Sequence, residues 1–245
     1  MRALRVSGIC FRSNLFAARR AKLPQLQQRF SSPSSVLTGK IACVVKEANE
    51  VADLYTKWGS DTYDDDVHKW GYQLPDLAVK YAKSVIGEKA FEGKRLLDAG
   101  AGTGLLSLCL KDAGIREATA IDISPEMLSK AMRSGFYSCC KVVDLKRDFA
   151  FADNEFDMSL CLGTLTYMEP ADLTLAELCR VTKPGGYVCF SMRTDLCEKW
   201  ESAQQSFVDK NIWTHMGTSE GFDYLPANPE YGNTILVKVY IYKVL

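Results

Sequence analysis

The stretch Leu96-Leu97-Asp98-Ala99-Gly100-Ala101-Gly102-Thr103-Gly104 decides the fold of this chain. An apolar run over 94–99 predicts a buried strand, and the amphipathic segment 103–114 predicts a helix that follows directly. The glycines therefore lie in the connecting loop, where the backbone can turn tightly and approach a ligand without a Cβ. Ligands of open α/β sheets bind at this position, beyond the carboxyl ends of the strands. The residues expected to contact a cofactor here are Asp98, Gly100, Ala101, Gly102, Thr103 and Gly104.

The spacing of these glycines discriminates between cofactors. A dinucleotide loop of the form G-x-G-x-x-G that starts at Gly100 requires glycine or alanine at position 105, where this chain has Leu105. The G-K-[ST] sequence of a phosphate-binding loop is also missing from the stretch. A carboxylate at Asp98 would repel a pyrophosphate, whereas it suits the ammonium group of S-adenosylmethionine. The loop therefore favours S-adenosylmethionine over a nicotinamide or flavin dinucleotide.

A second acid ends the next expected strand, 117–122. Asp122 follows the glycine loop at about the 20-residue separation expected of a ribose-binding acid. Its two oxygens can accept hydrogen bonds from the two ribose hydroxyls. Ile123 and Met127 come directly after it, and we expect them to border the adenine ring.

Two later strand ends complete the expected cofactor site. The strand 139–144 ends at Asp144, whose carboxylate can accept the adenine amino group while the backbone N–H of Leu145 addresses the ring. Aspartate after a strand is also a common turn residue, so a purely structural role for Asp144 stays open. The strand 156–162 ends at Leu162, which we expect beneath the methionine part of the cofactor.

The remainder of the chain up to Val244 alternates short apolar runs with amphipathic stretches, which is typical of a parallel sheet covered by helices. Further elements are expected as helices at 75–87, 125–134, 170–181 and 197–212, and as strands at 186–193 and 234–243. The last strand is either buried on both faces or pairs with another near 220–225. We interpret Lys183-Pro184-Gly185-Gly186 as a turn before the strand at 186.

The segment 41–93 precedes the sheet and is expected to be helical. Between 51 and 72 it mixes aromatic residues with aspartates. Two interpretations remain open for this stretch. It forms a lid over the cofactor, contacted through Tyr55, Trp58 and Tyr63, or it is a helix packed at the sheet edge with a solvated acidic turn.

The motifs L-D-x-G-x-G-T-G, I-D-x-S-x-x-M-L, D-N-x-F-D and V-T-K-P-G-G together resemble class I S-adenosylmethionine-dependent methyltransferases over roughly 94–193. Flanking residues, Tyr55-x-x-Trp58 and Gly71-Tyr72-x-x-Pro75 among them, are similar to a narrower group, that of methyltransferase-like protein 27. The resemblance implies an α/β, Rossmann-like, doubly wound fold over 94–245: a mostly parallel seven-stranded sheet with helices on both faces. It implies S-adenosylmethionine as cofactor and assigns no acceptor.

Methyl transfer from S-adenosylmethionine is an in-line displacement, so the protein mainly aligns and desolvates the reactants. Tyr167, just beyond the strand 156–162, is our candidate acceptor-contacting residue, with packing under the lid as the alternative. We expect a small molecule or a protein as acceptor. The main alternative function is a non-catalytic, cofactor-binding partner or assembly subunit, and a nicotinamide-dependent oxidoreductase is disfavoured by Leu105 and Asp98.

Basic and acidic residues are unevenly distributed along the chain, although its formal net charge is zero. The first acidic residue is Glu47, and the charged residues before it are all Lys or Arg. The acidic remainder of the chain argues against a broad nucleic-acid footprint. The leader 1–40 is rich in arginine, with Arg5, Arg12 and Arg19 at heptad spacing, which is typical of a mitochondrial transit peptide. We expect the matrix as location, with a basic tail on a cytoplasmic protein as the alternative.

Cysteine and histidine usage gives no support to a metal site. The chain has nine cysteines without a C-x-x-C pair, and its two histidines, His68 and His215, lie far apart in sequence. No apolar run reaches the roughly 18 residues that a membrane span requires. Oligomeric state is not predicted by any of these features.

Overall fold

The computed structural model of the chain describes residues 48–111, 113–168, 171–229, 231 and 234–245, and the expected leader 1–40 lies outside them. The elements before and within the first half of the sheet are α2 (Ala48–Trp58), α3 (Ser60–Lys69), α4 (Leu74–Ile86), β1 (Arg95–Ala99), α5 (Leu106–Leu110), β2 (Glu117–Asp122), α6 (Pro125–Arg133) and β3 (Cys139–Val142). The remaining elements are β4 (Phe156–Cys161), η2 (Leu165–Tyr167), α7 (Ala171–Val181), β5 (Thr182–Arg193), α8 (Glu198–Asp209), β6 (Trp213–Thr218), β7 (Phe222–Asp223) and β8 (Leu236–Val244).

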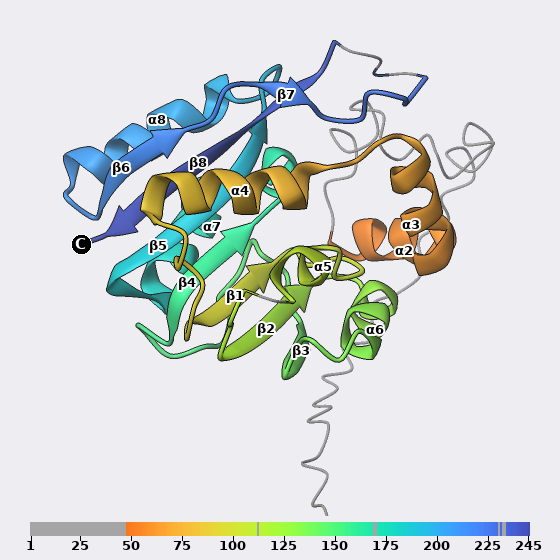
Figure 1. The fold of residues 1–245 in the computed structure, drawn as a ribbon, viewed down its shortest axis with the longest axis horizontal. Coiled ribbons are helices and arrows are strands. Elements are labelled where there is room, and N and C mark those ends of the chain that lie inside the picture. The colour runs from red at the N-terminus through yellow and green to blue at the C-terminus, as the bar shows by residue number, and fades with distance from the viewer. Residues whose placement is uncertain (1–47, 112, 169–170, 230, 232–233) are drawn as a thin grey trace, which may run out of the picture. The chain divides into compact units, whose positions relative to one another are not determined.

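The strands form one sheet in the order β3-β2-β1-β4-β5-β8-β6, with β7 paired to β8 off this path. The pairs from β3 to β5 are parallel, and β8 runs antiparallel to β5, β6 and β7. This arrangement confirms the predicted α/β, doubly wound, mostly parallel sheet (Figure 1). The strand order reverses between β1 and β4, and such a switch point is where α/β sheets bind ligands.

Each face of the sheet buries its own apolar cluster, because successive side chains of a strand point to opposite faces. Leu96 joins the cluster that α4 covers through Ala78, while its neighbour Leu97 joins the cluster that Leu175 of α7 and Trp200 of α8 complete. Figure 1 shows α4 and α7 on opposite faces of the sheet. Burial of both Leu96 and Leu97 explains why β1 reads as a continuous apolar run.

Several expected elements differ from those observed. The expected helix 103–114 is only α5, Leu106–Leu110, and the expected helix 197–212 ends at Asp209. The stretch Lys183–Gly186, interpreted as a turn, lies inside β5, where the register with β4 shifts between Phe156 and Met158. A local irregularity therefore absorbs the glycines while the strand continues.

The C-terminal strand β8 has the expected pairing partner near 220–225. β8 pairs with β5 and with β6, and its partner near 220–225 is β7. β6 was not predicted, because Trp213 is its one fully buried residue and Thr214, His215 and Met216 are exposed. An edge strand of this kind lacks the apolar alternation that sequence patterns detect.

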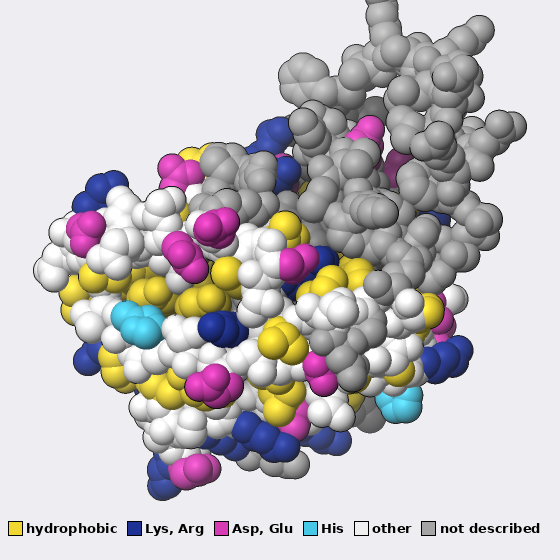
Figure 2. Space-filling model, turned by 90° about the horizontal axis from the view of Figure 1, so that it is seen from above, with side chains coloured by type: hydrophobic (Ala, Val, Ile, Leu, Met, Phe, Trp, Pro, Cys, Tyr) yellow, Lys and Arg dark blue, Asp and Glu magenta, His cyan; other side chains and the backbone are white. Residues whose placement is uncertain are grey.

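The surface of the described residues carries no large single-sign patch on the face that Figure 2 shows, where Lys and Arg are interspersed with Asp and Glu. Within the same residues, no helix combines the length and apolar character that crossing a bilayer demands.

Candidate cofactor and acceptor site

A cavity opens beyond the carboxyl ends of β1, β2 and β4, at the switch point of the sheet. Helices α2 and α3 and the start of α4 contribute another part of its wall. The residues predicted to bind the cofactor that line it are Tyr55, Tyr63, Asp98, Gly100, Ala101, Gly102, Thr103, Asp122, Ile123, Met127, Asp144, Leu145 and Leu162. The cavity therefore brings together positions spread over more than a hundred residues of sequence.

The glycine loop is held open toward this cavity. Gly100, Gly102 and Gly104 have φ values of 76°, 55° and 86°, in the left-handed region that favours glycine. The N–H groups of Gly100 and Ala101 donate to the carbonyl of Ile121 at 2.8 and 3.0 Å, which ties the loop to β2. A Cβ on Gly102 would meet no atom within 4 Å, so this glycine faces open space.

The other two glycines also permit close packing, and Gly100 lines the cavity as well. A Cβ on Gly100 would collide with the side chain of Thr164, and one on Gly104 would lie 3.0 Å from the Tyr137 ring and 3.1 Å from Ala131. Gly104 was predicted as a cofactor contact, but it is absent from the cavity lining. Its lack of a Cβ instead permits close approach of α6 to the loop.

Asp122 joins the glycine loop to the start of α6. Its Oδ2 accepts the N–H of Gly102 at 2.9 Å, and its Oδ1 accepts the N–H of Ser124 at 2.9 Å. Withdrawal from water raises the pKa of this carboxyl, and the backbone hydrogen bonds oppose that shift. Ile123 also donates its backbone N–H to this carboxylate, which keeps capacity for one further hydrogen bond.

Asp98 is buried at the end of β1 and is 3% exposed. Burial raises its pKa to about 7, the hydrogen bond from Tyr137 lowers it, and the charge of Asp122 raises it. Tyr137 donates its hydroxyl to Asp98 Oδ2 at 2.5 Å. Sequence analysis missed Tyr137, because it lies in a short connection before β3 where no pattern marks it.

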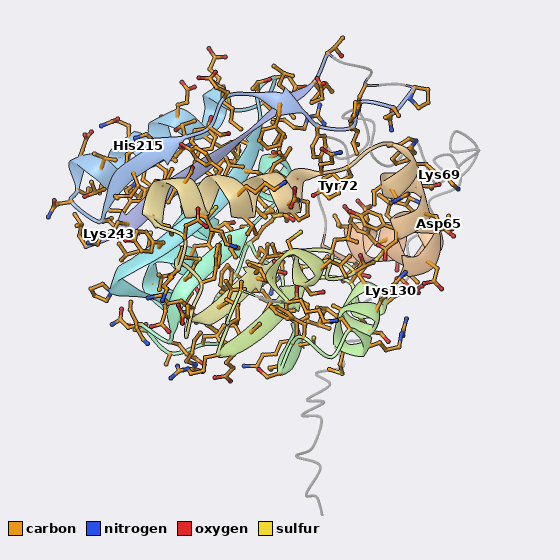
Figure 3. All side chains as sticks on the ribbon, in the orientation of Figure 1. Asp65, Lys69, Tyr72, Lys130, His215 and Lys243 are labelled. Carbon is orange, nitrogen blue, oxygen red and sulfur yellow. The ribbon has the colours of Figure 1, made fainter. Side chains whose placement is uncertain are left out.

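Helix α3 is tied to both the glycine loop and α6 through Asp64. The hydroxyl of Thr103 donates to Asp64 Oδ1 at 2.5 Å, and Lys130 Nζ lies 2.8 Å from Asp64 Oδ2. Lys130 also forms an ion pair with Asp61 at 2.6 Å. Figure 3 shows Lys130 beside α3, with Asp65 on the outer side of that helix.

Trp58 does not line the cavity, although we predicted it to contact the cofactor together with Tyr55 and Tyr63. The Trp58 side chain is 2% exposed and packs edge-on against the Tyr63 ring at 5.0 Å. Its indole N–H donates to Asp66 Oδ2 at 2.9 Å. Trp58 thus supports the cavity wall from behind.

The end of the cavity near β4 carries two tyrosines that sequence analysis did not assign, Tyr72 and Tyr224. Their rings meet edge-on at 5.8 Å. A Cβ on Gly163 would lie 2.9 Å from the Tyr72 hydroxyl and 3.6 Å from the Tyr224 hydroxyl, so both hydroxyls converge over this glycine. The backbone of Tyr167 ends η2, while its side chain lies outside the described part of the chain.

The opposite end of the cavity lies beyond β3. Asp144 Oδ1 accepts the N–H of Lys146 at 3.0 Å, and Asp144 Oδ2 lies 3.3 Å from Arg147 Nε. The carboxylate therefore organises a turn while also lining the cavity. Among the described residues, no group of three or more His, Cys, Asp or Glu side chains is arranged to hold a metal ion.

Comparison with known proteins agrees with this geometry. Residues 97–190 match the family model described as a methyltransferase domain. Human methyltransferase-like protein 27 is 30% identical over 174 residues, an alignment that covers 68% of this chain and 70% of that protein. The chain belongs to the class I S-adenosylmethionine-dependent methyltransferases. This methyltransferase accordingly uses S-adenosylmethionine as cofactor.

Two further proteins are similar to this methyltransferase over different shares of its chain. Malonyl-[acyl-carrier protein] O-methyltransferase of Erwinia billingiae is 41% identical over 102 residues, which cover 41% of this chain and 39% of that protein. The structure of magnesium protoporphyrin IX methyltransferase from Synechocystis, with bound cofactor, matches at a TM-score of 0.58 and 16% identity. It covers 82% of this chain and 98% of that chain, and at this identity it shows the shared fold.

Proposed function

We propose that this methyltransferase binds its cofactor across the ends of β1, β2 and β3 and methylates an acceptor held at the Tyr72–Gly163 end of the same cavity. The observation that carries the proposal is the continuity of the cavity. Asp98, Gly102 and Asp122 line one part of it, and Tyr72 and Gly163 line another. One enclosed space therefore serves both reactants.

The residues of the loop fit the cofactor. Gly102 leaves open the space that a Cβ would fill, and the Asp122 carboxylate keeps capacity to accept a hydrogen bond from the ribose. Asp98 supplies a carboxylate for the ammonium group of the amino-acid part. S-adenosylmethionine, when bound, supplies a methyl carbon that its sulfonium activates. The chain's own residues orient the two reactants and exclude water from between them.

The remaining lining suits the adenine and methionine parts. Ile123 and Met127 offer apolar walls for the ring, while Asp144 and Leu145 offer a carboxylate and a backbone N–H to its edge. Leu162 borders the methionine part at the end of β4.

For the acceptor we propose a small molecule or a group carried on a protein. Relatives include the malonyl-[acyl-carrier protein] O-methyltransferase of E. billingiae and the ubiquinone biosynthesis O-methyltransferase of Thiobacillus denitrificans, 28% identical over 184 residues. The names of these proteins indicate a carrier-bound and a small-molecule acceptor respectively. Tyr72, Pro75 and Met168 give the acceptor end an apolar and aromatic wall compatible with either.

The proposal is tested by incubating the protein with methyl-labelled cofactor and cell extract, then separating small molecules, protein and RNA. Label transferred to the small-molecule or protein fraction, and lost on replacement of Gly102 by Val, supports the proposal. Cofactor binding by calorimetry without label in any fraction would support the non-catalytic alternative instead. Label confined to RNA would overturn the acceptor class.

We further propose that α2 and α3 form a lid, held closed by Asp64. Asp64→Ala removes the hydrogen bond from Thr103 and the ion pair with Lys130, so dissociation of S-adenosylhomocysteine should accelerate roughly tenfold or more. Stopped-flow fluorescence of the nearby tryptophans measures this rate. Asp65→Ala is the matched control, because Asp65 is exposed on the same helix.

The two variants separate a lid from a structural edge helix. A lid predicts faster dissociation in Asp64→Ala only, with thermal stability within about 1 kcal/mol of the parent. Equal dissociation rates in Asp64→Ala and Asp65→Ala, with a lower melting temperature in the former, would mean that α3 serves only to stabilise the fold.

For the leader we propose import into the mitochondrial matrix, supported by its acid-free, arginine-rich composition. Replacement of Arg5, Arg12 and Arg19 by Glu should abolish import of the full chain into isolated mitochondria while cofactor affinity stays unchanged. N-terminal sequencing of protein from its native cells checks the expected cleavage near Phe30. An intact leader on a cytosolic protein would refute import into the mitochondrial matrix.

A further inference from the structure

Tyr137 stands behind the cofactor site without entering it. Its hydroxyl donates to Asp98 Oδ2 at 2.5 Å, and Asp98 lines the cavity whereas Tyr137 does not. Tyr137 is 6% exposed and Asp98 is 3% exposed, so water competes little for this hydrogen bond. The bond spans from the connection before β3 to the end of β1.

Packing fixes the Tyr137 ring in this position. The absent Cβ of Gly104 would lie 3.0 Å from Tyr137 Cε2, and the neighbouring Phe136 ring stands edge-on to it at 5.1 Å. A ring confined on these sides presents its hydroxyl in one direction. One oxygen of Asp98 is thereby engaged by Tyr137, while the Asp98 side chain lines the cavity.

Other titratable groups near Asp98 disfavour its charge. Burial raises the pKa of Asp98 to about 7, and the carboxylate of Asp122 on β2 acts in the same direction. Two thiols also interact with Asp98: Cys161 of β4 and Cys140 of β3 each have a raised pKa to which Asp98 contributes. The hydrogen bond from Tyr137 opposes these effects, because it stabilises the ionised carboxylate.

We propose that Tyr137 is a positioning residue for the cofactor, holding Asp98 in the orientation and the ionised form that the ammonium group of S-adenosylmethionine requires. This inference rests on the proposed placement of that ammonium group at Asp98. Its consequence is a specific pH dependence of binding, which a purely structural tyrosine would not produce.

The direction of the pH effect follows from the protonation states that bind. The complex needs ionised Asp98, so affinity for an aminoacyl ligand falls as the pH drops below about 7. At alkaline pH the ligand's own α-amino group loses its proton, and affinity falls again. A plot of affinity against pH therefore has an acidic limb, set by Asp98, and an alkaline limb, set by the ligand. Loss of the Tyr137 hydroxyl raises the pKa of Asp98 further, so the acidic limb moves to higher pH while the alkaline limb stays in place.

The test compares two ligands by calorimetry between about pH 5.5 and 8.5. S-adenosylhomocysteine carries the amino-acid part, and 5′-methylthioadenosine lacks it. In Tyr137→Phe we expect the acidic limb for S-adenosylhomocysteine to shift upward by about one unit, with roughly tenfold weaker binding near pH 6. Binding of 5′-methylthioadenosine should match the parent at every pH.

Two further variants separate the possible failures. Tyr187→Phe, in β5 and outside the cavity lining, should leave both profiles unchanged. Asp98→Asn should weaken S-adenosylhomocysteine binding and flatten its acidic limb. If Tyr137→Phe weakens both ligands equally and at all pH values, Tyr137 only packs, and the inference is overturned while the cofactor site stands. If Asp98→Asn binds S-adenosylhomocysteine like the parent, the ammonium group lies elsewhere, and the placement falls together with the inference.

Discussion

Gly102→Val is expected to abolish measurable binding of S-adenosylmethionine while the protein remains folded. A side chain at this position meets no atom of the described protein within 4 Å and therefore projects into the cavity, where the ligand would lie. We expect a loss of at least about 100-fold in affinity, equivalent to about 2.7 kcal/mol. Calorimetry with S-adenosylhomocysteine measures this loss, and thermal unfolding reports the fold.

Gly135→Val is the matched control for backbone strain. Gly135 has a φ of 71°, near the 55° of Gly102, and a Cβ there also meets no atom within 4 Å. Both variants force a β-branched residue into the left-handed region and should lose similar stability. Only Gly102→Val obstructs the cavity. Equal cofactor affinity in the two variants would show that the ligand does not cross the glycine loop.

Gly100→Ala should weaken binding for a different reason, because it disturbs the packing of the loop. Its new Cβ would collide with Thr164, whose hydroxyl donates to the carbonyl of Gly100 at 3.3 Å. Either the glycine loop or Thr164 must move, so we expect a lower melting temperature together with weaker cofactor binding. The contrast between Gly100 and Gly102 separates a glycine that permits packing from one that leaves room for a ligand.

The sequence alone predicts that Asp98, Gly102 and Asp122 lie close together. Each follows an apolar run, and the carboxyl ends of neighbouring parallel strands meet at one edge of a sheet. The register confirms that β1 and β2 are neighbours, since Asp98 pairs with Ala120 and Ala99 with Ile121. Local periodicity and chain order were therefore enough to predict this part of the cavity.

The residues that sequence analysis missed reach the cavity by tertiary packing alone. Tyr224 follows β7, far along the chain from Tyr72, yet their hydroxyls converge over Gly163. No spacing rule links such positions. Trp58 shows the converse case, because an aromatic residue in an amphipathic helix contributes equally well to a cavity wall or to the interior behind it, and Trp58 is 2% exposed.

Asp122→Ala is expected to weaken cofactor binding by roughly 10- to 150-fold, corresponding to about 1.5–3 kcal/mol of charge-assisted hydrogen bonding. The carboxylate accepts the N–H groups of Gly102 and Ser124, so it has two roles. It holds the loop against α6, and it offers its remaining acceptor capacity to the ribose. Affinity alone does not separate these roles, because either loss weakens binding.

A double-deletion cycle separates the two roles of Asp122. In it, the Asp122 carboxylate and the 2′-hydroxyl of the ligand are removed singly and together. An S-adenosylhomocysteine analogue without the ribose 2′-hydroxyl should bind the parent about tenfold more weakly than the complete ligand, since one charge-assisted hydrogen bond is missing. In Asp122→Ala the same deletion should have almost no further effect, because the partner of that hydroxyl is already gone. If the two losses add in full, Asp122 shapes the loop without touching the ribose, and the acid that recognises the ribose must be sought elsewhere along the cavity wall.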